Sequence, residues 1–281
     1  MERSTEILVD TSWLSEHQND QNLKIIEIDT PPLPRLIKKY IPNSFLLDWK
    51  KDLWHTTKRD FVVGVDFKRL MEKAGISNQD TIVCCSTIKQ FATYAYWILK
   101  YNNHNDVRLL DGGPEKWFSE GFPVTDEPYN LSKYSKSTYE INDVNSKIRE
   151  FKEYVLQNLQ RNDVMILDAR SPEEYEGKLI NIPELPQEGS LRAGRIPGAK
   201  NTYFEENFRQ DGTFKSISDL QNIYSAKKIT SDKEIITYCR MGHRATLIWF
   251  VLSQLLHYNN VKLYDGSWTE WGNLVNVPIE K

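Results

Sequence analysis

Cysteine, excess charge and long apolar runs are all scarce in this chain of 281 residues. Its three cysteines, Cys84, Cys85 and Cys239, are too few and odd in number for a disulfide framework, so we expect free thiols. The net charge of −3 gives no electrostatic footprint for nucleic acid or an anionic membrane. No apolar run approaches the ~18 residues of a spanning helix. The first six residues lack the plan of a secretory signal, which predicts a cytoplasmic protein.

The histidines show no ligand spacing, so no metal site is predicted. What the chain does contain is a long internal repeat. Asp111-Gly112 followed by Trp117 recurs as Asp265-Gly266 followed by Trp271, and other matched pairs keep the same order. A period this long indicates a duplicated domain rather than a solenoid. We therefore predict a first domain over residues 1–125, a polar linker over 126–137 and a second domain over 138–281. The second copy is longer by a polar loop around residues 178–192.

Each copy alternates short apolar runs with helical spacing. The predicted strands are 24–28, 81–85, 164–167 and 234–238, and the predicted helices are 66–74, 151–159, 218–226 and 245–257. This alternation predicts an α/β fold in which a parallel sheet is flanked by helices in each domain.

One loop has the composition of a reactive site. The strand 234–238 runs directly into Cys239-Arg240-Met241-Gly242-His243-Arg244, and a helix follows. Loop amides and the helix N-terminus bring positive charge to a cysteine placed there, and two arginines add full charges. Such surroundings lower the pKa of a thiol and bind an anion beside it. Gly242 allows the backbone to curl where a side chain would obstruct it.

The loop has two other interpretations. A buried cysteine that happens to precede a helix is common, but the two arginines and the glycine within six positions favour a reactive thiol. A cysteine phosphatase holds phosphate in a C-x5-R loop, whose arginine would fall at position 245, occupied here by Ala245. The shorter C-x4-R loop suits a persulfide better than a phosphate.

The sequence resembles the two-domain rhodanese family, in its thiosulfate sulfurtransferase branch, over nearly the whole chain. The resemblance is carried by the Cys239 loop and by Asp168-Ala169-Arg170-Ser171-Pro172-Glu173-Glu174-Tyr175, Gly194-Arg195-Ile196-Pro197-Gly198-Ala199, Asp211-Gly212-Thr213-Phe214-Lys215-Ser216 and Tyr264-Asp265-Gly266-Ser267-Trp268-Thr269-Glu270-Trp271-Gly272-Asn273. It implies two tandem rhodanese-like domains.

The resemblance also implies a ping-pong sulfurtransferase in which Cys239 takes the outer sulfur of thiosulfate and passes it to cyanide, a thiol or a protein acceptor. Arg240 and Arg244 would hold the sulfonate of the donor, and the amides from Arg240 through Met241, Gly242 and His243 to Arg244 would hold the persulfide sulfur. We expect His243 at the rim of the loop, either as a bystander or tuning pH dependence near neutrality. No metal or organic cofactor is implied.

Two departures from the family pattern bear on structure and donor. Arg195 replaces the usual histidine, at a position we interpret as structural. The residues after Arg170 lack the arginine that contacts mercaptopyruvate in some members, which argues against that donor. Asp168 and Arg170 are expected to form a salt bridge that fixes the loop.

The first domain is predicted to be catalytically silent. Counting along the repeat aligns Cys239 with Thr87, and residues 87–92 contain no cysteine, arginine or glycine. Cys84 and Cys85 fall within the preceding strand and are predicted to be packed thiols. A mercaptopyruvate sulfurtransferase and a persulfide carrier without turnover remain alternatives to a thiosulfate sulfurtransferase.

Overall fold

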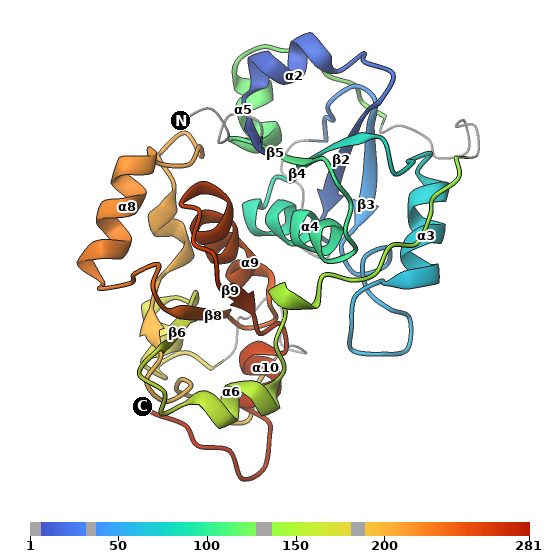
Figure 1. Ribbon diagram of the computed structural model, residues 1–281. Coiled ribbons are helices and arrows are strands. Elements are labelled where there is room, and N and C mark those ends of the chain that lie inside the picture. The colour runs from blue at the N-terminus through green and yellow to red at the C-terminus, as the bar shows by residue number, and fades with distance from the viewer. Residues whose placement is uncertain (1–6, 32–37, 128–136, 181–188) are drawn as a thin grey trace. The chain divides into compact units, whose positions relative to one another are not determined.

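A computed structural model describes residues 7–31, 38–127, 137–180 and 189–281 (Figure 1). The chain divides into two compact units, the first comprising Met1–Asn145 with Arg209–Phe214 and the second comprising Ser146–Phe208 with Lys215–Lys281. Most of the predicted linker, residues 128–136, and part of the loop around 178–192 lie outside the described residues.

The first unit is built around a five-stranded parallel sheet with the strand order β1-β5-β4-β2-β3. Its elements are β1 (Leu8–Val9), α2 (Thr11–His17), β2 (Leu23–Asp29), β3 (Ser44–Asp48), α3 (Gly64–Lys73), β4 (Thr81–Cys85), α4 (Lys89–Tyr101), β5 (Val107–Leu110) and α5 (Gly113–Ser119). The central strands carry apolar residues on both faces, as strands covered on both sides do.

The second unit is built around a four-stranded parallel sheet with the strand order β7-β6-β8-β9. Its elements are η2 (Ser146–Ile148), α6 (Lys152–Asn158), β6 (Val164–Asp168), α7 (Pro172–Tyr175), β7 (Lys200–Asn201), η4 (Phe204–Asn207), α8 (Ile217–Ala226), β8 (Glu234–Tyr238), α9 (His243–Trp249), η5 (Phe250–Leu255), β9 (Val261–Leu263) and α10 (Ser267–Trp271).

The two sheets repeat one topology. The order β5-β4-β2-β3 of the first unit corresponds to β9-β8-β6-β7 of the second. Where β1 pairs with β5 in the first unit, a single parallel bridge joins Arg149 to Leu263 in the second. The repeated tryptophans have the same partners: the indole N–H of Trp117 donates to the carbonyl of Pro123 at 2.7 Å, and that of Trp271 to Pro278 at 2.8 Å. The predicted duplication and α/β fold are confirmed.

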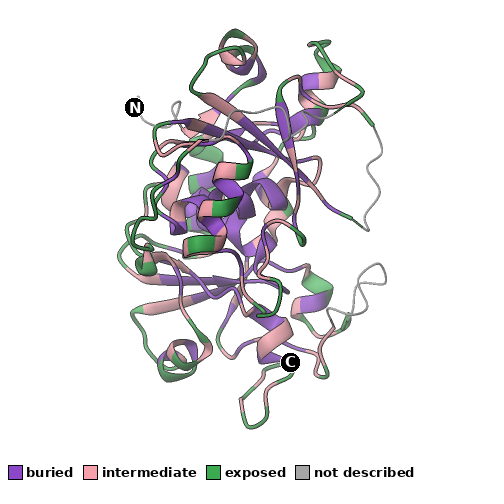
Figure 2. Ribbon diagram, turned by 90° about the vertical axis from the view of Figure 1, so that its right-hand side faces the viewer, coloured by how far each residue is buried: buried purple, intermediate pink, exposed green. Residues whose placement is uncertain are grey.

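The strands agree with those predicted from the sequence, whereas one predicted helix differs from the observed structure. Each predicted strand lies within one residue of an observed strand at either end. The expected helix 245–257 instead begins at His243 as α9 and continues from Phe250 as the π-helical segment η5. Both segments are almost fully buried, as their continuous apolar composition indicated, and Figure 2 shows how burial concentrates in the sheets and their covering helices.

The core of the second unit holds the sheet against its C-terminal elements. Buried residues from α6, β6, β8, α10 and the adjoining loops form one apolar cluster that includes Val155, Ile236, Tyr264 and Trp271. This cluster packs around β8, whose carboxyl end carries the cysteine loop, and so gives that loop a rigid base. Among the described residues, no helix combines the length and apolar character needed to cross a membrane.

Candidate active site

Cys239 is the first residue after β8, at the carboxyl edge of the second sheet. The chain leaves β6 outward to β7 and then returns to β8 on the other side of β6, so the direction of strand order reverses between β6 and β8. Ligands of open parallel sheets bind outside the carboxyl ends of the strands at such a reversal. The fold therefore places Cys239 at the position where this class of sheet builds its sites.

The backbone of the loop closes around the sulfur. The N–H of Gly242 donates to Sγ of Cys239 with an N···S distance of 3.2 Å. Gly242 has φ +96°, and an added Cβ would lie 3.2 Å from Cβ of Asp265. Arg149 holds that aspartate in place through two hydrogen bonds of 2.9 and 3.0 Å. Only glycine fits this turn without strain or displacement of Asp265.

The beginning of α10 fixes the orientation of the loop. The N–H of Cys239 donates to Oγ of Ser267 at 3.1 Å. The N–H of Trp268 donates to the carbonyl of Cys239, and the N–H and hydroxyl of Thr269 both donate to the carbonyl of Arg240. In a trans peptide the carbonyl and the following N–H point in opposite directions, so the N–H groups of Arg240 and Met241 point away from α10.

The two arginines of the loop share a buried carboxylate. Glu174, on α7, accepts from both terminal nitrogens of Arg244, Nη1 at 2.5 Å and Nη2 at 2.9 Å. Nη1 of Arg240 lies 3.9 Å from the same carboxylate. The side chain of Glu174 is set at this position by a capping box with Ser171, in which each residue bonds to the other's backbone N–H.

The pKa directions follow from this arrangement. Burial alone would raise the pKa of Glu174, but the hydrogen bond and charge of Arg244 lower it. Burial likewise opposes the charge of Arg244, yet its bond to Glu174 raises its pKa. Burial lowers the pKa of Arg240, and the neighbouring positive charges of Arg244 and Arg170 lower it further. Both loop arginines interact electrostatically with Cys239.

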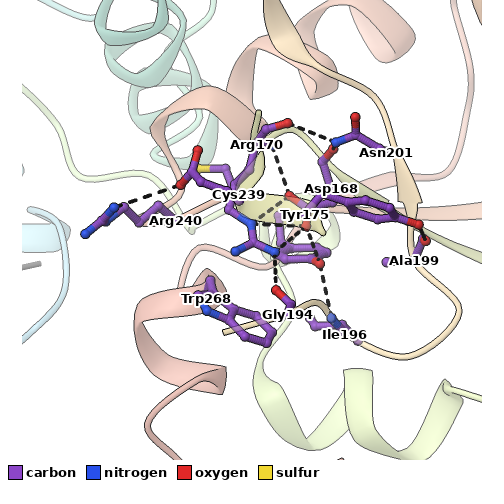
Figure 3. Close-up of polar contacts among 12 residues, drawn as sticks. Asp168, Arg170, Tyr175, Gly194, Ile196, Ala199, Asn201, Cys239, Arg240 and Trp268 are labelled. Atoms are coloured by element: carbon purple, nitrogen blue, oxygen red, sulfur yellow. Dashed lines mark hydrogen bonds and ion pairs between the residues drawn. The ribbon is translucent and has the colours of Figure 1, made fainter. Parts of the chain in front are cut away.

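A second buried ion pair lies next to the loop, as Figure 3 shows. Nε and Nη2 of Arg170 donate to the carboxylate of Asp168, and the guanidinium also lies 4.6 Å over the ring of Trp268. The hydroxyl of Tyr238 donates to the same carboxylate at 2.6 Å. The network ties the ends of β6 and β8 together directly below Cys239. The predicted salt bridge between Asp168 and Arg170 is confirmed.

The structure brings the predicted site residues into one loop, in which all except the part-buried Arg244 are buried. Cys239 is 1% exposed, Arg240 3% and Met241 6%, while Gly242 caps α9 and Arg244 is its second residue. The expectation that His243 lies at the rim is wrong: it is 3% exposed, because it is the first residue of a helix packed on β8 and β9.

Sequence reasoning missed Glu174, Ser267 and Thr269 as parts of the site. The Ser171-Pro172-Glu173-Glu174 pattern predicts a capping box, but nothing local indicates that the carboxylate also reaches Arg244. Arg195, expected to be structural, pairs with Glu280 and lies 4.5 Å over the ring of Tyr175.

The corresponding loop of the first unit is one residue shorter. Strand β4 ends at Cys85 and α4 begins at Lys89, whereas β8 ends at Tyr238 and α9 begins at His243. Counting from the strand ends, the counterpart of Cys239 is Ser86, not the Thr87 obtained from the repeat spacing. The hydroxyl of Ser86 donates to the carbonyl of Ile28 at 2.9 Å.

The remaining thiols are packed inside the first sheet, as predicted. Cys84 and Cys85 lie on β4 and are fully buried, and Cys85 contacts the carbonyl of Ile26 at 3.6 Å. Burial raises the pKa of Cys84 far above its ordinary value. In the described part of the chain, no cluster of three or more His, Cys, Asp or Glu residues could hold a metal ion.

Comparison with known proteins identifies the class to which this fold and site belong. The rhodanese-like domain model matches residues 10–120 and 151–274, one match in each repeat. The chain belongs to the rhodanese-like family, whose members include sulfurtransferases, and it carries two such domains.

Curated relatives match along almost the entire chain. It is 44% identical to "Sulfur carrier protein TtuD" of Thermus thermophilus over 98% of this chain and 97% of the relative. It is 40% identical to "Putative thiosulfate sulfurtransferase" of Saccharopolyspora erythraea over 98% of this chain and 96% of the relative. A crystal structure of the anaerobic ergothioneine biosynthesis enzyme of Chlorobium limicola superimposes with a TM-score of 0.83 at 21% identity, covering 100% of this chain and 71% of that one. The last likeness concerns the fold alone.

Proposed function

We propose that the protein is a thiosulfate sulfurtransferase in which Cys239 carries the transferred sulfur. The thiolate of Cys239 attacks the outer sulfur of thiosulfate, a new S–S bond forms, the original S–S bond breaks, and sulfite leaves with the bonding pair. One thiolate charge and two thiosulfate charges become one persulfide charge and two sulfite charges. Cyanide or a thiolate then attacks the outer persulfide sulfur and regenerates the Cys239 thiolate.

The observation that carries this proposal is the amide of Gly242 held 3.2 Å from Sγ of Cys239. A backbone donor aimed at the sulfur, together with two guanidinium groups that interact with it, stabilises a thiolate and a persulfide anion. The N–H groups of Arg240 and Met241 point away from α10, and we propose that they donate to the outer sulfur of the persulfide. No cofactor enters the reaction.

The class of donor is inferred from the residue at position 174 and from the length of the Cys239 loop. Glu174 stands in the segment where a mercaptopyruvate-binding arginine would be expected, so a carboxylate there disfavours that 2-oxo acid. The C-x4-R loop has one residue fewer than a phosphate cradle, which disfavours a phosphatase. The proposal also keeps the first unit silent, because Ser86 replaces the nucleophile and the loop 86–88 has no arginine.

A donor and acceptor panel tests the proposal. Thiocyanate release from thiosulfate and cyanide should exceed release with mercaptopyruvate as the donor, and Cys239→Ser should abolish it. The conservative matched control is Cys84→Ser, which changes a buried thiol of the first unit and should keep the wild-type rate. Full turnover by Cys239→Ser would refute the nucleophile, and a clear preference for mercaptopyruvate would refute the donor.

A second candidate, a sulfur carrier that hands its persulfide to a protein, is favoured by the relative named as a sulfur carrier protein. It uses the same first half-reaction and differs in the acceptor. The two candidates differ in whether small acceptors remove the persulfide sulfur. A persulfide that forms stoichiometrically on Cys239 but is not removed by excess cyanide or small thiols would favour the carrier, whereas rapid discharge would favour the enzyme.

A further inference from the structure

Glu174 is the buried negative group among the arginines of the Cys239 loop. Its side chain is 4% exposed, and its carboxylate takes both terminal nitrogens of Arg244 while lying 3.9 Å from Nη1 of Arg240. A bidentate guanidinium–carboxylate pair is strong and fixes the plane of the guanidinium. The two terminal nitrogens through which Arg244 could present a bidentate fork to a donor oxyanion are therefore engaged by Glu174.

The charges around the thiol balance when Glu174 is included. Two guanidinium groups and one carboxylate leave one net positive charge, which matches the single negative charge of a thiolate or a persulfide. Without the carboxylate the loop would present two uncompensated positive charges to a doubly charged donor and to the sulfite that must leave. Glu174 thus weakens the hold of the loop on dianions.

We infer that Glu174 is a positioning residue that determines donor binding: it withdraws Arg244 from the donor and leaves Arg240 as the guanidinium that meets the oxyanion. This inference rests on the proposed function and refines it, since the sequence assigned both arginines to the sulfonate. Glu174 acts through Arg244 and does not touch the transferred sulfur.

The first test replaces Glu174 with glutamine. Glutamine also completes a capping box with Ser171, so α7 keeps its N-terminal hydrogen bonds. Glu174→Gln should release Arg244 toward the donor, lower the KM for thiosulfate about threefold to tenfold, and lower kcat because sulfite dissociates more slowly and inhibits at lower concentration. Glu173→Gln, an exposed neighbouring carboxylate, is the matched control and should change neither constant.

A rescue experiment tests the role of Glu174 most decisively. Arg240→Gln should raise the KM for thiosulfate by about tenfold or more, because it removes the guanidinium assigned to the donor. Adding Glu174→Gln to that variant should restore part of the loss, since the released Arg244 replaces the missing charge. If the double variant has a KM equal to or higher than that of Arg240→Gln, Glu174 has only a structural role and the inference is wrong.

A readout independent of sulfur transfer separates this inference from the proposed function. In a Cys239→Ser background, which takes up no sulfur, the dissociation constant for sulfite should fall about threefold to tenfold with Glu174→Gln and rise with Arg240→Gln. Failure of the wild type to take sulfur from thiosulfate would overturn the proposed function, whereas an unchanged affinity for sulfite with Glu174→Gln would overturn the charge role of Glu174.

If Glu174→Gln does not fold, substitution by the shorter aspartate provides a second test. Glu174→Asp keeps the charge but its carboxylate cannot reach both nitrogens of Arg244, so one nitrogen is released. Added to the Arg240→Gln variant, it should still lower the KM for thiosulfate. No such lowering would contradict the inference.

Discussion

At the scale of single residues, a carboxylate controls the behaviour of the cysteine loop. Glu174 is buried, yet its pKa is lowered, because the hydrogen bond and charge of Arg244 outweigh the cost of burial. An acid whose pKa is lower in the folded than in the unfolded protein contributes stability above its ordinary pKa of about 4.3 and loses it as the pH falls through the folded value.

The contribution of Glu174 to stability should therefore depend on pH. At about pH 7, Glu174→Gln should lower the free energy of unfolding by about 3 kcal/mol, because it leaves the guanidinium of Arg244 buried without its carboxylate. The gap should narrow as the pH falls below the ordinary glutamate pKa of about 4.3, because the unfolded chain then takes up a proton that the folded wild-type protein does not yet bind. Chemical unfolding of both proteins across this range measures it, and a constant gap would contradict the ion-pair account.

At the scale of elements, the loop owes its shape to the segments on either side. Gly242 has a φ of +96°, Asp265 leaves no space for a side chain beside it, and α10 holds the carbonyls of Cys239 and Arg240. Cys239 is therefore positioned by three elements: it directly follows β8, its loop leads into α9, and α10, more distant in sequence, binds the carbonyls of the loop. Strain at one glycine should affect chemistry more than stability.

Two glycine substitutions separate strain from site geometry. Gly242→Ala and Gly64→Ala both place alanine at a positive φ, which costs about 1–3 kcal/mol. Only at Gly242 would the new Cβ meet a neighbour, while Gly64 has open space around it. Sulfur loading from thiosulfate should therefore fall about tenfold or more in Gly242→Ala and stay at the wild-type rate in Gly64→Ala. Equal loading in both would show that the turn does not position the sulfur.

The sequence predicts local structure well and distant contacts poorly. The strands around Ile236 and Val83 follow from continuous apolar runs, and the Cys239 loop from its own composition. The bond from Arg244 to Glu174 spans 70 residues, and no periodicity encodes it. The assignment of Thr87 as the counterpart of Cys239 failed because the two loops differ by one residue in length, which only the strand ends reveal.

At the scale of the whole molecule, one fold is repeated and only the second copy has the composition of the reactive loop. The strand orders coincide, and both copies keep a buried tryptophan bonded to a proline carbonyl. The loops after β4 and β8 differ in length by one residue and in composition. Duplication thus preserved the scaffold, while the chemistry depends on a few residues at one sheet edge.

The silence predicted for the first unit can be tested by moving the thiol. A Ser86→Cys substitution in a Cys239→Ser background places a cysteine directly after β4, in a loop without arginine or glycine. We expect no sulfur loading from thiosulfate, because no positive charge in the loop 86–88 supports a thiolate there. Mass measurement of the intact protein checks this, and loading comparable to wild type would show that the loop composition is not decisive.

The three thiols should also differ in their reactivity toward iodoacetamide in the native protein. All three thiols are buried, but Cys239 lies in a loop at the edge of its sheet, whereas Cys84 and Cys85 lie within a central strand and burial raises the pKa of Cys84. Iodoacetamide should therefore modify Cys239 and spare Cys84 and Cys85. All three should react after denaturation. Peptide mapping of the native and denatured samples measures the pattern, and early modification of either strand cysteine would contradict it.

The central claim is that Cys239 receives the outer sulfur of thiosulfate. The most direct measurement is peptide mass spectrometry of the protein after brief exposure to thiosulfate and removal of excess donor. The account predicts one added sulfur atom on the peptide containing Cys239, lost on addition of cyanide and absent from Cys239→Ser. Added sulfur on Cys84 or Cys85, or none on any cysteine, would contradict it.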